Sequence, residues 1–187
     1  GNGRLMAGPS IAKDLQNTLR EAFATAERMR HEYVTLEHLL LALLDDRTAG
    51  KAISDCGGNR ARMRARLNEF LEEAQAPMPA GVTFEAQQTI SLDRVIQRAA
   101  IHAMSSQMDT IDGAHVLIQF FKEEDSHALF VLQQEGLTAL TLKQYVSHGG
   151  DTGGKIVKRR GDRAFDDDGQ DELEDGEGSS ATDPLEA

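Results

Sequence analysis

The chain has 187 residues, of which 40% are hydrophobic, and this is enough apolar material for one sizeable folded domain. Its net charge of −11 is uneven: residues 149–187 hold 12 acidic and 5 basic side chains, so the remainder is mildly acidic and a nucleic-acid partner is not expected. The single cysteine excludes an internal disulfide, and no apolar run reaches the ~20 residues that span a bilayer, so we expect a cytoplasmic protein with no membrane partner.

The first predicted helix covers residues 10–30, with Ser10 as a residue type that commonly caps a helix N-terminus. Apolar residues recur within it at steps of three and four, which places them along one face. Thr35 is the next predicted N-cap, because Val34 before it and Leu39 after it have the spacing of a hydrophobic staple. A second helix is therefore expected to begin at residue 36.

Two more helices complete the first half of the chain. One is predicted over residues 47–56, where Gly57 supplies the left-handed conformation that ends a helix. The next covers residues 59–75. Two prolines and a glycine then interrupt the apolar pattern, so residues 76–88 are expected to form a joint between two halves.

The second half of the chain repeats this order of helices. Four are predicted, the third of them ended by Gly136, and they cover residues 91–106, 113–122, 126–135 and 138–147. No segment shows the period-two alternation of a half-buried strand, so no strand is expected. The predicted fold class is all-α, with eight helices.

The two halves are related by an internal repeat with a period of 77 residues, the separation of His38 and His115. At this offset the apolar residues coincide: Leu15 with Leu92, Leu19 with Ile96, Ala22 with Ala99, Ala26 with Ala103, Val34 with Ile111 and Leu39 with Val116. Such a period is too long for a solenoid of short repeats. We therefore expect a pseudo-twofold bundle of two four-helix repeats, residues 10–75 and 89–148.

The two ends of the chain are expected to lie outside this domain, which spans residues 10–148. Residues 1–9 are interpreted as a tag or a disordered N-terminus, because the first methionine comes only at position 6. Residues 149–187 are rich in glycine and acidic residues without helical apolar spacing, which predicts a flexible acidic linker. The basic cluster inside it, residues 155–163, is interpreted as a charge block that keeps the linker solvated.

His31, Glu32 and His38 suggest a metal site, but their spacing is wrong for one. They do not fit the His-Glu-x-x-His pattern, and Thr35 is predicted to begin a new helix between them. Because His115 occupies the position equivalent to His38 in the second half, we interpret both histidines as partly buried residues that satisfy backbone groups near helix starts. No metal or cofactor is expected, and a metal-dependent hydrolase that uses these three residues is the remote alternative.

Two further features have a non-catalytic interpretation. Residues 149–155 fit the Gly-x-x-x-x-Gly-Lys spacing of a phosphate loop, but Ile156 stands where a magnesium-binding Ser or Thr is needed, and no strand precedes them. Cys56 lies at a predicted helix end without a histidine and acid relay, so it is interpreted as a small buried hydrophobe. Nothing in the sequence indicates a catalyst.

Two groups of residues break the repeat, and such residues are free of the demands that the fold makes on both halves. One lies at the end of the first helix and the other at the start of the fifth. These positions are candidates for a partner surface: His31, Glu32, Tyr33, Thr89, Ser91 and Arg94.

Residues 31–43, with the sequence His-Glu-Tyr-Val-Thr-Leu-Glu-His-Leu-Leu-Leu-Ala-Leu, resemble the signature of the Clp N-terminal domain of the AAA+ unfoldase family. Residues 94–99, 105–106 and 145–149 are more similar to ClpA-type members than to ClpC or ClpB relatives. The resemblance covers about residues 11–149. Residues 183–187 resemble the lead-in to the first ATPase module, so the chain is expected to be the N-domain with its linker, without the ATPase modules.

The resemblance implies an eight-helix bundle with no activity of its own, in a bacterial protein. In that family the domain docks adaptors and protein substrates above a hexameric ATPase ring, which unfolds substrates into the peptidase ClpP. For ClpA-type members the adaptor is ClpS, which brings proteins with N-terminal degradation signals (N-degrons). By resemblance, the adaptor-facing positions fall on Glu32, Thr89 and Arg94, with His31, Tyr33 and Ser91 as further candidates.

An alternative within the same class stays open. A ClpC-like or ClpB-like N-domain would take other adaptors, or bind unfolded clients directly through an apolar groove. Solvent exposure of Phe84, Phe120 or Phe121 would favour direct client binding.

Overall fold

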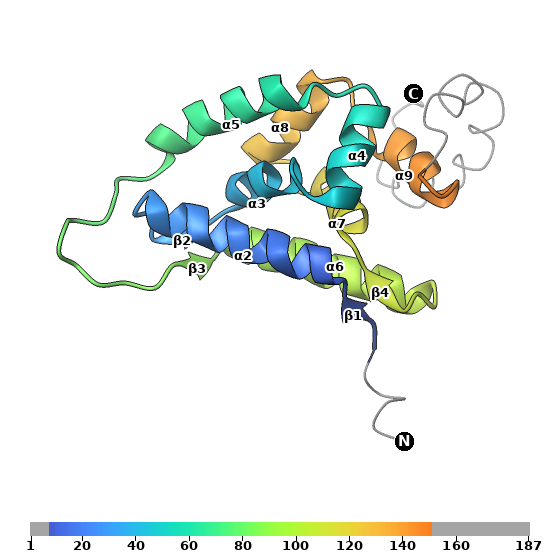
Figure 1. Ribbon diagram of the computed structural model, residues 1–187, viewed down its shortest axis with the longest axis horizontal. Coiled ribbons are helices and arrows are strands. Elements are labelled where there is room, and N and C mark those ends of the chain that lie inside the picture. The colour runs from blue at the N-terminus through green and yellow to red at the C-terminus, as the bar shows by residue number, and fades with distance from the viewer. Residues whose placement is uncertain (1–7, 151–187) are drawn as a thin grey trace, which may run out of the picture.

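The computed structural model describes residues 8–150. In this part the chain forms eight α-helices and four very short strands (Figure 1). In chain order the elements are β1 Ser10–Ile11, α2 Lys13–Arg28, β2 Tyr33–Val34, α3 Leu36–Leu43, α4 Arg47–Asp55, α5 Arg60–Ala74, β3 Gln87–Gln88, α6 Ile90–Ser105, β4 Thr110–Ile111, α7 Gly113–Gln119, the 3-10 turn η1 Phe120–Lys122, α8 His127–Gln134 and α9 Ala139–Ser147. The predictions for the N-terminal tag, the acidic linker and most of the phosphate-loop spacing lie outside the described residues.

All eight predicted helices are present, and most of their boundaries follow from local capping. Thr35 is the N-cap of α3, and Gly57 and Gly136 have the positive φ angles, 102° and 79°, that end the helices before them. The prediction for Ser10 is wrong. α2 begins at Lys13 after Ala12, which makes no side-chain cap, and Ser10 lies in β1 instead.

The expectation of no strands is also wrong. β1 pairs in parallel with β4 (Ser10 opposite Thr110), and β2 pairs in parallel with β3 (Tyr33 opposite Gln87). Each strand has two residues, which is too short for an alternating pattern to appear in the sequence. Both pairs join one repeat to the other.

The strand pairs follow the internal repeat of the sequence. At the offset of 77 residues β1 falls on β3 and β2 falls on β4, so the two pairings are equivalent under the pseudo-twofold relation. The same offset relates Arg30 and Gln107, which have left-handed φ angles of 60° and 58° and are the only such non-glycine residues described. The fold thus repeats its irregular backbone as well as its helices.

α3 and α7 form the centre of a single hydrophobic core. Seven of the eight residues of α3 are buried, and α7 buries Gly113, Ala114, Val116 and Leu117. α2 packs on α3 and α6 packs on α7, while α4 crosses to α7 and α8 crosses to α3. Because the outer helices cross between the repeats, the buried residues of both halves form one cluster.

Two buried carboxylates bind the N-termini of helices. Asp46 caps α4 by accepting hydrogen bonds from the amides of Thr48 and Ala49, and it also accepts one from the hydroxyl of Thr18 (2.6 Å). Glu37 accepts a hydrogen bond from the amide of Ala128 in the first turn of α8 (2.7 Å). Amide donors at a helix start favour a negative charge, so these contacts fasten the helices to one another.

The joint between α5 and β3 passes around one side of the molecule (Figure 1) and is held by Arg30. The guanidinium donates hydrogen bonds to the carbonyls of Met78, Pro79 and Val82 (3.0, 2.6 and 2.7 Å). It also lies 5.0 Å from the centre of the Phe84 ring, within cation–π range. The segment is therefore shaped by contacts with the end of α2.

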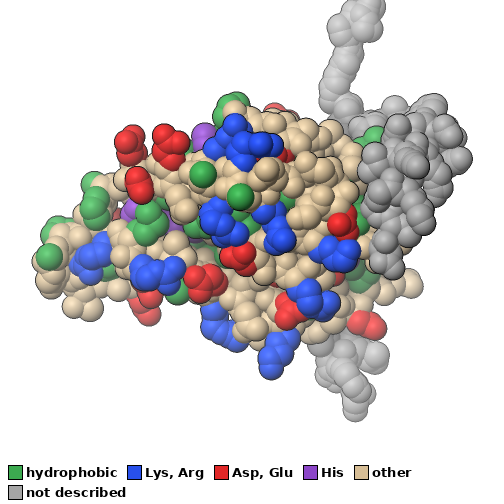
Figure 2. Space-filling view, turned by 45° about the horizontal axis from the view of Figure 1, so that its top comes forward, with side chains coloured by type: hydrophobic (Ala, Val, Ile, Leu, Met, Phe, Trp, Pro, Cys, Tyr) green, Lys and Arg blue, Asp and Glu red, His purple; other side chains and the backbone are tan. Residues whose placement is uncertain are grey.

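None of the helices described is long and apolar enough to cross a membrane. On the face drawn in Figure 2, basic and acidic side chains are interspersed.

Candidate functional site

The pairing of β2 with β3 brings together the two groups of residues that break the repeat. The carbonyl of Glu32 accepts a hydrogen bond from the amide of Gln87 (3.0 Å), and the carbonyl of Val34 accepts one from the amide of Thr89 (3.1 Å). Residues 32–34, after α2, therefore lie against the start of α6. We call the surface formed by Glu32, Tyr33, Thr89 and Ile90 the β2–β3 surface.

The backbone of this surface is fixed, while the side chains of Glu32, Tyr33 and Ile90 face solvent. Gln75 at the end of α5 donates to the carbonyl of Tyr33 and accepts from its amide, at 2.9 and 3.1 Å. Tyr33 remains 46% exposed and Ile90 76% exposed. Glu32 is also exposed. An acidic, an aromatic and an aliphatic side chain thus stand on a rigid backbone.

Thr89 serves the local fold. Its hydroxyl accepts a hydrogen bond from the amide of Leu92 (3.2 Å), so it is the N-cap of α6. Sequence reasoning placed the helix start one residue late, at Ser91.

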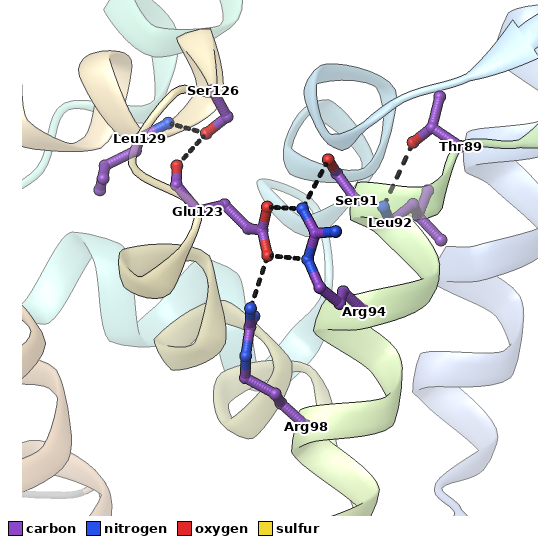
Figure 3. Close-up of polar contacts among 8 residues, drawn as sticks. All are labelled: Thr89, Ser91, Leu92, Arg94, Arg98, Glu123, Ser126 and Leu129. Carbon is purple, nitrogen blue, oxygen red and sulfur yellow. Dashed lines mark hydrogen bonds and ion pairs between the residues drawn. The ribbon is translucent and has the colours of Figure 1, made fainter.

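Arg94 lies one turn into α6 and is turned toward Glu123 (Figure 3). Its Nε and Nη2 donate to the two carboxylate oxygens of Glu123 at 2.9 and 2.7 Å, and Nη2 also contacts the hydroxyl of Ser91 at 3.3 Å. Arg98 donates to the same carboxylate at 2.7 Å. Hydrogen bonds from Arg94 and Arg98 lower the pKa of the buried Glu123 to about 2.

This ion cluster changes the interpretation of Arg94. Its side chain is half exposed, but its guanidinium already has a bidentate partner within the domain. A partner protein would therefore meet the outer edge of an ordered cation. Sequence reasoning did not identify Glu123 or Arg98, and no local pattern marks a pairing between residues 29 positions apart.

His31 and His38 lie in the interior and bind each other. Their side chains are buried, with 3.0 Å between Nδ1 of His31 and Nε2 of His38. Nδ1 of His38 accepts a hydrogen bond from the amide of Thr35, so His38 completes the cap of α3, and we infer that its Nε2 carries the proton. Burial and the nearby His31 lower the pKa of His38 to about 4. His31 does not reach the β2–β3 surface.

The twin of His38 has a similar position. Nδ1 of His115 lies 2.8 Å from the carboxylate of Asp112, the N-cap of α7. Both histidines therefore contact the cap of their own helix, but only His38 satisfies a backbone group, and it is fully rather than partly buried. Within residues 8–150, no three His, Cys, Asp or Glu side chains are grouped so as to hold a metal ion.

The remaining candidates, Cys56 and three phenylalanines, are partly or fully buried in the domain. Burial raises the pKa of the Cys56 thiol to about 11, which disfavours the nucleophilic thiolate. Phe120 is fully buried, and Phe84 and Phe121 are partly buried against the core. The exposure that would favour direct client binding is thus not found at these three residues. Large hydrophobic side chains that sequence reasoning missed are exposed elsewhere, at Val82, Ile90, Ile101, Met104 and Phe130.

Comparison with known proteins agrees with this fold. A ClpA homolog from Fuscovulum blasticum is 36% identical over 142 residues, which are 75% of this chain and 18% of that protein, so the chain spans less than a fifth of its relative. The N-terminal domain of Hsp104 from Candida albicans aligns over 76% of this chain and 93% of its own, with a TM-score of 0.62 and 13% identity. A ClpV N-domain in complex with a VipB peptide aligns over 74% and 85%, with a TM-score of 0.58 and 17% identity.

Residues 10–135 match the Clp repeat (R) N-terminal domain. The match covers the first repeat, the joint and the second repeat through α8. Together with the ClpA-like relative, it shows that the chain belongs to the Clp repeat N-terminal domain family.

Proposed function

We propose that this chain is the adaptor- and substrate-docking domain of a ClpA-like unfoldase. It binds ClpS and so delivers N-degron substrates to a hexameric ATPase ring that works with ClpP. Residues 10–148 form the docking domain and residues 149–187 its tether, and the domain itself performs no catalysis. Family membership and the ClpA-like relative support this role. The ClpV N-domain that carries a VipB peptide is a precedent for protein docking on the same fold.

The observation that carries the proposal is the exposed β2–β3 surface. Its residues differ from those at the equivalent place in the other repeat, where Asp109 and Thr110 match Glu32 and Tyr33. The packing of the bundle therefore does not require the exposed side chains of Glu32, Tyr33 and Ile90, whereas Thr89 also caps α6. Exposed aromatic and aliphatic side chains beside a charge suit a protein partner.

Arg94 extends this surface along α6. Because Glu123 and Ser91 hold its guanidinium, little side-chain entropy is lost when a partner binds it. An acidic group of the adaptor would meet a cation that is already in place. Reversal of Arg94 is an ambiguous test, since it would place two carboxylates together and disturb the junction of α6 with η1.

The first experiment is a calorimetric titration of this chain with purified ClpS at two salt concentrations. We expect saturable one-to-one binding that weakens at higher salt, because exposed charges are screened. A folded, monodisperse chain that does not bind ClpS would contradict the proposal.

The site is tested by Glu32→Lys, with Asp109→Lys as the matched control. Both acids are exposed, occupy equivalent positions of the repeat, and accept a strand-pair hydrogen bond through their backbone carbonyls. Glu32→Lys should weaken ClpS binding about tenfold or more, equal to roughly 1.4 kcal/mol, and Asp109→Lys should leave it unchanged. Equal effects of the two variants would show that the β2–β3 surface is not the docking site.

A further inference from the structure

A groove lies between the C-terminal half of α5 and the exposed side of α8. Its volume is about 540 Å³. The residues that line it are Arg66, Glu69, Phe70, Glu73, Ala74, His127, Phe130 and Gln134. We call it the α5–α8 groove.

Aromatic rings form one part of its wall. The ring of Phe70 stacks on that of His127, with 4.1 Å between centroids and an interplanar angle of 6°. Phe130 follows at 5.4 Å from His127, and 51% of it is exposed. A flat, apolar surface of this kind favours a planar or apolar guest group.

The contact between α5 and α8 has an equivalent within the repeat. Toward the end of the chain the offset becomes 79 residues, the separation of Gly57 and Gly136. At this offset the hydrogen bond from Arg66 to Gln134 corresponds to that from Tyr145 to Asp55, each 2.7 Å long. Helix α5 and its partner α8 therefore match α9 and its partner α4.

The groove occupies the part in which the two repeats differ. α5 has 15 residues and α9 has 9. At the same offset Phe70 falls on Gly149, which lies after the end of α9. On the other wall, Phe130 stands where the first repeat has Lys51, an exposed residue paired with Asp55.

The rim of the groove is acidic. Glu69 and Glu73 are exposed, lie four residues apart on one face of α5, and make no hydrogen bond or ion pair with another side chain in residues 8–150. Like charges at this spacing repel each other, and negative charge is unfavourable near a helix C-terminus. The last turn of α5 contains no basic residue to offset this. A cation bound at the groove would remove the repulsion.

We propose that the α5–α8 groove binds an arginine of a partner protein together with an apolar residue beside it. A guanidinium is planar, stacks on aromatic faces and matches carboxylates with two parallel hydrogen bonds. Glu69 and Glu73 supply the carboxylates, Phe70 and His127 the aromatic face, and Phe130 the contact for the apolar neighbour. Arg66 keeps its positive charge, because its hydrogen-bond acceptor Gln134 is neutral, but the two carboxylates outnumber this single cation in the lining.

The groove borders the β2–β3 surface without depending on it. Gln75, which holds the backbone of Tyr33, directly follows the lining residue Ala74. At the other end, Ser126 next to the Arg94 cluster precedes His127. A segment of a docked protein can therefore pass from one surface to the other, while each surface is tested by its own variants.

The test uses the full chain and a short, end-blocked fluorescent peptide that has one arginine between two leucines in a Gly/Ser background. Binding is followed by fluorescence anisotropy at low salt. We expect saturable binding, and at least about tenfold weaker binding when citrulline replaces the arginine, because the urea group keeps the shape but lacks the charge. Absence of binding, or equal binding of the citrulline peptide, would overturn the proposal.

Matched variants locate the site. The double variant Glu69→Gln/Glu73→Gln should weaken peptide binding about tenfold or more, as should Phe130→Ala, whose side chain is half exposed and dispensable for the core. Glu72→Gln is the control, since Glu72 is exposed on the same helix but does not line the groove. Circular dichroism verifies the fold of each variant. Unchanged binding by the double variant, or an equal loss with Glu72→Gln, would contradict the assignment whatever the outcome with ClpS.

Discussion

Arg30 and Gln107 occupy equivalent positions of the repeat and share a left-handed backbone, but their side chains have different surroundings. Both follow the last turn of a helix, and the amide of the next residue bonds back to the carbonyls of Ala26 and Ala103, at 2.8 Å in each case. Arg30 binds three carbonyls of the joint, whereas Gln107 is exposed and makes no such contact. Both repeats therefore end this helix with the same backbone conformation, but only in the first repeat does the side chain at this position hold the joint.

This difference gives a paired prediction. Gln107→Gly should raise the free energy of unfolding by up to about 1 kcal/mol, because glycine adopts a left-handed φ without steric cost. Arg30→Gly should lower it by about 1–3 kcal/mol despite the same relief, since the hydrogen bonds that hold residues 78–82 are lost. Urea unfolding of both variants measures the two changes. A stabilised Arg30→Gly variant would contradict the anchoring role.

For single residues, the sequence predicts contacts between positions that are close together in the chain. Thr35 as a cap followed from spacing, and a backbone contact of His38 near the helix start followed from the repeat. The ion pair of Arg94 with Glu123 was not, because it depends on how α6 meets η1. The six candidate residues consequently divide into exposed ones such as Glu32, a helix cap at Thr89 and an interior histidine at His31.

At the scale of elements, α7 can approach α4 closely because it begins with glycine. A Cβ on Gly113 would collide with the carboxylate of Asp46, the buried cap of α4. The amide of Ala114 also donates to the hydroxyl of Thr48, at 3.0 Å. The two helix starts, one from each repeat, therefore meet through one carboxylate and one hydroxyl.

Gly113→Ala should accordingly lower the free energy of unfolding by about 1–3 kcal/mol, the usual cost of overpacking. In an Asp46→Ala background the same change should cost clearly less, because the opposing carboxylate is gone. Thermal and urea unfolding of the four proteins in this cycle give the coupling. Additive effects would mean that the two residues do not oppose each other.

The helices were predictable as elements because their caps and apolar stripes are local. The strands were not, since two residues carry no periodicity, and their pairing is set by residues 54 or 100 positions away along the chain. The misplaced start of α2 has the same origin. Ser10, a good cap by type, is drawn into β1 by the carbonyl of Asp109, to which its amide donates (3.0 Å).

For the whole molecule, stability should fall as the pH falls below about 6.5. The folded protein holds His38 neutral down to a pKa of about 4, whereas the unfolded chain protonates it near 6.5. The unfolded state therefore binds more protons over this range. Burial also lowers the pKa of His31, which acts in the same direction. Below about pH 4.5, protonation of Glu123 in the unfolded state adds a second loss that continues toward pH 2.

The upper part of this profile is tested with His38→Gln. Glutamine at this position can still accept from the amide of Thr35 but does not titrate. The native chain should lose about 2 kcal/mol between pH 7.5 and 5 through His38, and the variant should show a correspondingly flatter profile. Urea unfolding at several pH values supplies the data. Parallel profiles would show that His38 is not the titrating group.

The bundle as a whole was predictable because the repeat reveals itself in a single sequence. The α5–α8 groove was not, since its walls come from helices more than 50 residues apart. The available signal was an apolar residue, Phe130, where the other repeat has Lys51. Comparing the repeats for exposed differences identifies such positions, once the structure shows which of them face solvent.

The two strand pairs also show how the two halves of the domain are joined. Each pair joins one half to the other, and the two are equivalent, which is the arrangement of an isologous homodimer. A lone half would expose two unpaired edges whose complements exist in a second copy of itself. The segment between α5 and β3 thus acts as a covalent link between the two halves and fixes their ratio at one to one. Because the halves are linked in one chain, their surfaces can differ. The first half has Lys13 and Lys51 where the second has Ile90 and Phe130.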